Sequence, residues 1–338
     1  MAPLRSSSGR SFGKLLGVNR SNDLANDTNS GASQRGQLNS RYVGARAQAL
    51  EFISPLVATG GTKITTPDYV YHVFEYDANP QSFVVQAATE GEITYLVVGG
   101  GGGGSNQHSG GAGAGGLRTN DPNSAPGGPG TSSEGTYTCT AGTYTVIVGA
   151  GGPGSGPGSS QPIGSGGGYS SFNDGAINSL AKIRSEGGGG GAGAAGGNLG
   201  WSPTPDPNKG ASGNTPGAGG AGRAVPAFPG PVVAPGITIA TPVAPNPFAT
   251  VVGPTGLYAG GGAGGMYTPR SPGNTASSGG TGGGGNSNST GSYPPADNAK
   301  GGAGVSGCGG GGGGSGRFEA VGGVGGHGVV MIRYAAPS

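Results

Sequence analysis

Glycine is the feature that most limits how this chain can fold. It supplies 84 of the 338 residues and gathers in uninterrupted runs, including residues 99–104 and 309–314. The glycines keep no strict three-residue period, which excludes a collagen triple helix. Each glycine loses roughly 0.5–1 kcal/mol more than alanine when it is ordered. Because only 32% of the residues are apolar, an ordered body needs dense backbone hydrogen bonding, association between chains, or both.

Short segments rich in β-branched and aromatic residues alternate with the glycine runs, as is typical of strands. The segments are residues 69–76, 82–85, 94–98, 143–148, 182–186, 257–259 and 328–334. Most of them lead directly into glycine, whereas the last one follows a glycine-rich stretch. No long window has the periodicity of a helix. The sequence therefore predicts an all-β protein, with a glycine-rich, β-sandwich-like body and long loops.

The glycine runs themselves favour a particular packing. Without Cβ atoms, neighbouring backbones can approach closely as left-handed helices with three residues per turn. The amides would then bond between segments rather than within them, which satisfies buried backbone groups without side chains. The alternative is that the runs are flexible loops that join a small sandwich.

Residues 201–255 interrupt this pattern with twelve of the 27 prolines and the single tryptophan, Trp201. Proline cannot donate to a sheet, so a central strand is excluded there. We expect an extended or looped insertion that is stiffened by polyproline-like segments.

The charge is unevenly distributed. Residues 1–50 hold seven basic and two acidic residues, whereas the remainder holds ten basic and thirteen acidic residues. We interpret residues 1–61 as an extended basic arm, with a short helix near residues 45–52, that docks on a partner by strand addition or strand exchange. The candidate docking residues are Arg5, Arg10, Phe12, Leu15, Leu16, Arg20, Arg41 and Arg46. Binding of nucleic acid by the arm is the rival interpretation; the basic residues are dispersed and hardly interleaved with aromatics, which disfavours it.

Several motifs occur in a fixed order through residues 62–335. They include Tyr95–Gly104, Gly142–Gly152 and the closing stretch Gly326–Tyr334. In this respect the chain resembles the glycine-rich domain of fibre, adhesin and other virion proteins of tailed phages, which is common in marine cyanophages. The resemblance implies a β body with packed glycine segments, often oligomeric and displayed on a virion. The family has no catalytic residue that could be assigned to this chain. The resemblance does not include the arm, and a proline-rich insertion of this kind is unusual in the family.

Motifs for catalysis or cofactor binding lack their required context. Residues 111–116 match the dinucleotide pattern GxGxxG, but residues 117–122 predict a turn rather than the helix that such a site needs. The histidines His72, His108 and His327 and the cysteines Cys139 and Cys308 have no metal-ligand spacing. Asn173-Asp174-Gly175 indicates only a turn. We expect no catalytic residue, cofactor or metal, and two free buried thiols rather than a disulfide.

Aromatic residues between polar loops are candidates for contact with sugars or protein surfaces. The candidate host-contact residues are Trp201, Phe228, Tyr267 and Tyr293. No apolar run is long enough for a membrane-spanning helix, and the N-terminal residues lack the apolar core of a secretory signal.

The expected partners and location follow from the arm and the resemblance. We expect a virion protein that is assembled in the host cytoplasm and docked on tail, baseplate or capsid proteins. It would form a homo-oligomer, most simply a trimer, and contact a host receptor or glycan. A capsid-decorating or vertex protein and a secreted glycine-rich matrix protein are the alternatives.

Overall fold

The computed structural model describes residues 56–87, 91–106, 110–124, 134–157, 163–191, 217–238, 247–265, 277–287, 300–315 and 320–337. They belong to one compact unit that begins at Pro55. Two antiparallel sheets dominate it, which confirms the all-β prediction. The short strand β1 (Val57–Thr59) pairs with β4 and so lies in this body. The end of the arm expected at residue 61 is therefore placed too late.

The first sheet has five strands in the order β1-β4-β8-β9-β10. Their bounds are β4 Gln81–Ala87, β8 Gly142–Ile147, β9 Ser170–Phe172 and β10 Ile183–Ser185. The second sheet has six strands, in the order β2-β3-β13-β5-β6 with β7 also paired to β5. Their bounds are β2 Thr62–Thr65, β3 Tyr69–Phe74, β5 Gly91–Val98, β6 Leu117–Thr119, β7 Tyr137–Cys139 and β13 Val329–Ala335. Gly60 and Gly61, with φ of +114° and +57°, make the tight turn by which the chain passes from β1 to β2.

A core of aromatic and branched side chains fills the space between the two sheets. Phe83, Tyr144 and Phe172 of the five-stranded sheet meet Phe74 and Ile332 of the six-stranded sheet. Side chains alternate between the two faces of a strand, so the neighbouring residues of β3, β5 and β13 point the other way. That opposite face is also buried, in a second cluster. This explains why these strands are apolar on both faces.

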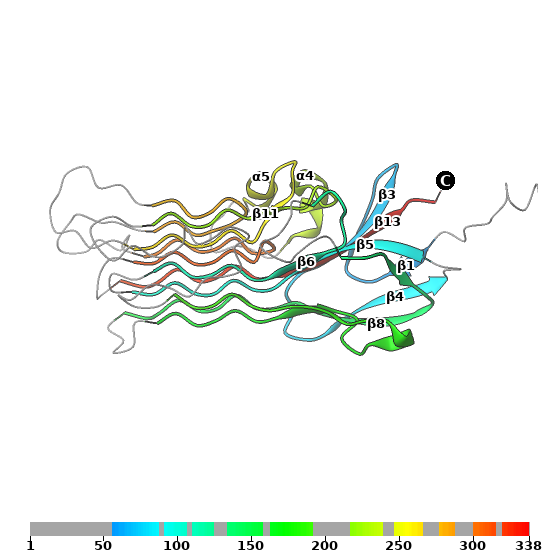
Figure 1. The fold of residues 1–338 in the computed structure, drawn as a ribbon, viewed down its shortest axis with the longest axis horizontal. Helices are drawn as coiled ribbons and strands as arrows, with labels where there is room; N and C mark the ends of the chain where they lie inside the picture. Colours follow the sequence, from blue (N-terminus) through cyan, green and yellow to red (C-terminus); the bar gives the residue numbers. More distant parts are fainter. Residues whose placement is uncertain are drawn as a thin grey trace, which may run out of the picture. The chain divides into compact units, whose positions relative to one another are not determined.

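The proline-rich insertion covers this second face. It contains the short strand β11 (Arg223–Ala224) and the short helices α4 (Gly230–Val233), η2 (Ala234–Gly236) and α5 (Phe248–Val252), and β11 pairs with β12 (Leu257–Tyr258), which follows the insertion. A further short helix, η1 (Ile177–Ser179), follows β9. Figure 1 shows α4 and α5 together beside β11.

In the part of residues 201–255 that the structure describes, the insertion is looped and carries short helices, so of the two expected forms the looped one holds and the extended one does not. Proline is tolerated in the first turn of a helix, where the amide has no partner, and α4 and η2 carry proline there.

Glycine-rich segments continue eight of the strands beyond the sandwich. Residues after β5, β8, β10 and β12, and residues before β6, β9, β11 and β13, run side by side away from the sheets (Figure 1). Residues 117–119, which we expected in a turn, form β6 instead, because Val98, Val97 and Leu96 of β5 pair with them. The turn begins only at Asp121.

Candidate functional site

The glycine segments form a bundle that is held together by hydrogen bonds between backbones. Run 99–104 lies at one of its centres, and its successive amides donate in rotation to three different segments. The acceptors are Gly116, Gly168, Gly326, Gly113, Ser165 and Gly323, in order from Gly99 to Gly104. Each partner therefore recurs at every third residue, as a three-residue helix requires.

The same run accepts hydrogen bonds from three further segments. The donor pairs are Gly152 and Ser155, Gly188 and Gly191, and Gly312 and Ser315, which bond to carbonyls between Gly100 and Ser105. Run 99–104 and its extension to Ser105 thus touch six neighbours. Run 309–314 is a second centre of the same kind, bonded to the segments that hold Ala112, Gly260, Gly285, Gly302 and Gly323 as well as to run 99–104.

Lack of space explains why these two runs contain only glycine. The residues of run 99–104 have no positive φ, so other amino acids could adopt their backbone. A Cβ on Gly100, Gly101, Gly102, Gly103 or Gly104 would, however, lie 2.0–2.1 Å from a carbonyl oxygen of a neighbouring segment. Every direction is occupied, so every position must lack a side chain. The interpretation of the runs as packed helices, rather than as flexible loops, holds for the described residues.

The outer segments need glycine at only some positions. Val321 and Val324 are three residues apart on an outer segment, and Val324 is 42% exposed. Ala150 and Pro153 repeat the same spacing on the neighbouring outer segment, with Pro153 exposed. Side chains are therefore carried where a segment faces outward, and glycine remains where it faces inward.

The far end of the bundle gathers the ends of the described segments (Figure 1). The Ser315 amide donates to the Ser105 carbonyl, and the Gly264 amide donates to the Gly217 carbonyl. Similar bonds join Gly164 to Gly191 and Ser287 to Ser277. The described segments that border residues 107–109, 158–162, 192–216, 266–276, 288–299 and 316–319 therefore end at this end of the bundle.

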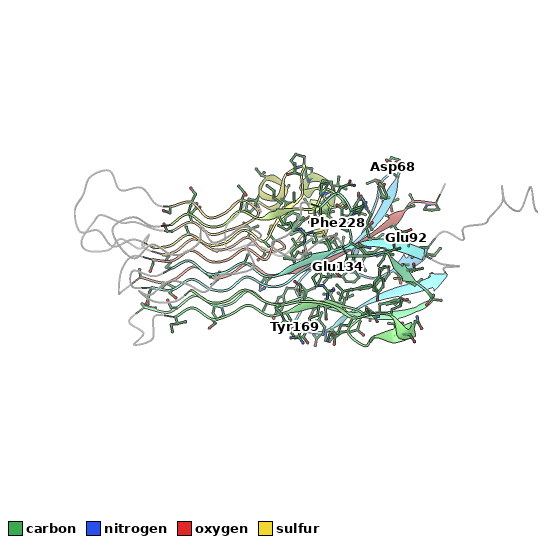
Figure 2. The ribbon with its side chains drawn as sticks, in the orientation of Figure 1. Asp68, Glu92, Glu134, Tyr169 and Phe228 are labelled. Atoms are coloured by element: carbon green, nitrogen blue, oxygen red, sulfur yellow. The ribbon has the colours of Figure 1, made fainter. Side chains whose placement is uncertain are left out.

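The candidate host-contact residues have different outcomes. Trp201, Tyr267 and Tyr293 lie outside the described residues, but the residues that flank them, such as Gly191 and Gly217, lie at the far end of the bundle. Phe228 does not suit a surface contact: its side chain is fully buried, edge-to-face against Tyr71 of β3. Phe228 belongs to the insertion, and Figure 2 labels it close to the insertion's short helices. The docking residues from Arg5 to Arg46, the helix expected near residues 45–52 and His108 also lie outside the described residues.

Both cysteines are free and buried, as expected, and they lie in separate cores. Burial raises the pKa of the Cys139 thiol to about 12 and raises the pKa of the Cys308 thiol further. Neither thiol has the lowered pKa of a reactive cysteine.

The two described histidines are held by backbone groups. His72 Nδ1 lies 2.7 Å from the Gly60 carbonyl and Nε2 lies 3.1 Å from the Tyr334 hydroxyl. A carbonyl can only accept, so the neutral His72 ring carries its proton on Nδ1. His327 Nδ1 instead accepts from the Gly151 amide at 2.9 Å. Burial lowers the pKa of both rings.

Two polar networks that sequence patterns did not reveal hold the loops around the sandwich. Arg118 of β6 makes two 2.6 Å bonds to the Glu134 carboxylate, which also accepts from the Tyr95 hydroxyl at 2.6 Å. The buried Asp121 carboxylate accepts from the Ala227 amide at 2.9 Å. The partners in these networks are up to about a hundred positions apart in the sequence. No local sequence pattern therefore indicates that they contact each other.

Within the described ranges, no three His, Cys, Asp or Glu side chains come together as metal ligands would. The helices of those ranges are too short or too polar for any of them to cross a bilayer. The geometry instead defines a class of protein, a β-sandwich whose strands continue into a close-packed bundle of glycine helices.

The chain belongs to the glycine-rich domain family, whose model matches residues 78–335. Among curated proteins, none matches this sequence.

Proposed function

We propose that this chain is a structural protein of a phage particle, fibre- or adhesin-like and without enzymatic activity. Its N-terminal arm docks it on other virion proteins, and its bundle displays host-contact segments. The order of the motifs resembles that in virion proteins, which motivates this assignment. The difference between the two ends of the body supports it.

The observation that carries the proposal is that the two ends of the body differ. The chain enters the described structure at Leu56, which packs in the sandwich core. The residues that flank Trp201, Tyr267 and Tyr293 lie at the opposite end of the bundle. Hydrogen bonds between the glycine segments continue along the bundle from one end to the other. We call this network the backbone lattice, and it provides a stiff spacer between an attachment point and a contact surface.

Host contact is tested by adsorption. Particles that carry Trp201→Ala, Tyr267→Ala and Tyr293→Ala together should lose at least about tenfold in adsorption rate, because aromatic residues contribute most of the energy at contact surfaces. The control is Val324→Ala, an exposed position on the side of the bundle. Unchanged adsorption by normally assembled triple-variant particles would refute the contact role and leave the structural one.

Placement on the particle is tested by electron microscopy of virions labelled on this chain. Label on tail fibres or baseplate supports the proposal, whereas label confined to the capsid shell would favour a decorating or vertex protein. Removal of residues 1–54 should leave particles without this chain, since the arm supplies the docking contact.

A further inference from the structure

His327 lies where the bundle joins the sandwich, two residues before β13 begins at Val329. Its ring stacks on the ring of Tyr76, with centroids 4.4 Å apart and planes 9° apart. Its carbonyl accepts from the amides of Gly307 and Gly309, both at 3.0 Å. His327 therefore connects the loop after β3, the segment of Gly151 and the turn that begins the central run 309–314.

The bond from the Gly151 amide determines the protonation state of the ring. A backbone amide can only donate, so Nδ1 must present its lone pair and the neutral ring carries its proton on Nε2. A proton added at Nδ1 would point at the Gly151 N–H, and a peptide group in the lattice cannot rotate to accept it. His72 differs, because the partner of its Nε2 is the Tyr334 hydroxyl, which can turn and accept.

Among the residues that the structure describes, none forms an ion pair with the His327 ring. Tyr76 is the titratable side chain against the ring. The carboxylates on either side of it are engaged elsewhere, Glu75 by Thr238 and Asp77 by Asn79. Cys308, in the turn that bonds the His327 carbonyl, is a buried thiol with a raised pKa.

We propose that His327 makes the junction between bundle and sandwich acid-sensitive: protonation of its ring breaks the Gly151 bond and loosens the outer segment of residues 149–157. The bonds that run 99–104 makes to segments other than residues 149–157, such as the bond from the Gly102 amide to the Gly113 carbonyl, stay closed. Acid would thus open one edge of the bundle without unfolding it.

Burial lowers the pKa of His327 in the folded protein, which fits a ring that is kept neutral. An unfolded histidine has a pKa of about 6.5. The stability that His327 contributes is therefore fully present above that pH and is lost as the pH falls through the lowered folded value.

The test follows the amide exchange of Gly151 in the full-length protein by NMR between pH 7.5 and pH 5, corrected for the intrinsic rate. Protection at Gly151 should fall by up to about tenfold per unit of pH as the pH drops from about 6.5 toward the lowered folded pKa of His327, and it should level off below that value. Gly102, whose amide bonds to the Gly113 carbonyl, is the internal control and should keep its protection. Constant protection at Gly151 over this range would overturn the proposal.

A second arm uses His327→Asn, since the side-chain oxygen of asparagine can accept from Gly151 at every pH. This variant loses the stacking on Tyr76, so its unfolding midpoint should fall, but its Gly151 protection should no longer depend on pH. An acid-induced loss as large as in the parent protein would assign the effect to another group, such as His72, and would also overturn the proposal.

Discussion

At the scale of single residues, most glycines of the bundle are required because neighbouring backbones leave no room for a Cβ atom. Fewer of them are required because their φ is positive. A Cβ at Gly101 would lie 2.0 Å from the Gly310 carbonyl oxygen, whereas a Cβ at the exposed Gly166 would meet nothing closer than 3.4 Å. Both positions are glycines in glycine-rich segments of the bundle. They differ in how closely neighbouring backbone atoms approach them.

Gly101→Ala should therefore lower the free energy of unfolding by about 3 kcal/mol or more, because the lattice cannot yield to the added methyl group. Gly166→Ala is the matched control and should change it by less than about 1 kcal/mol, with stabilisation favoured by the reduced entropy of the unfolded chain. Denaturant titration of both variants measures the difference. Equal effects at the two positions would contradict a close-packed interior.

The thiols give a second test at this scale. Cys139 and Cys308 are buried and their pKa values are raised, so a thiol reagent should label neither of them in the native protein at pH 8. Two equivalents should react after denaturation. Rapid native labelling of Cys308 would show that the cover formed by the insertion opens readily.

At the scale of elements, the insertion is attached to the sandwich by a buried carboxylate. Asp121 accepts from the amides of Ala227 and Asn123. Asp121→Ala leaves the buried Ala227 amide without a partner and should cost about 2–3 kcal/mol. Asp121→Asn keeps an acceptor oxygen and should cost less. Urea unfolding compares the two, and equal losses would indicate that the hydrogen bond contributes nothing.

The glycine runs are the other elements whose order can be measured. The amides of Gly101 and Gly312 bond across the bundle, so hydrogen exchange at these positions should be as slow as in the core strands β5 and β13. Exchange at the rate of an open loop would show that the runs are not packed in solution.

At the scale of the whole molecule, we predict that the protein forms a trimer. The ordering of the many glycines in the described segments opposes folding, and association adds buried contacts and makes stability depend on concentration. Sedimentation should give three times the mass of the 31.9 kDa chain. A monomer that unfolds cooperatively, at the same denaturant concentration over a hundredfold range of protein, would contradict this prediction.

The local elements of the fold could be predicted from the sequence alone. β-Branched and aromatic residues predicted the strands at residues 69–76, 82–85 and 328–334 because those side chains fit a pleated, half-buried surface. The glycine runs predicted close-packed helices because only backbones without Cβ atoms can approach so closely. The free cysteines and the turn at Asn173 followed from the same kind of local reasoning.

Which glycine segments pair with each other could not be predicted from the sequence and became visible only in the folded structure. A glycine helix presents the same backbone groups in every direction, so its sequence does not specify its neighbours. Pairs as distant in sequence as Gly101 and Gly326 are brought together by the register of β5 and β13, the strands that lead into them. The burial of Phe228 was decided in the same way, because it depends on the insertion folding back over the six-stranded sheet.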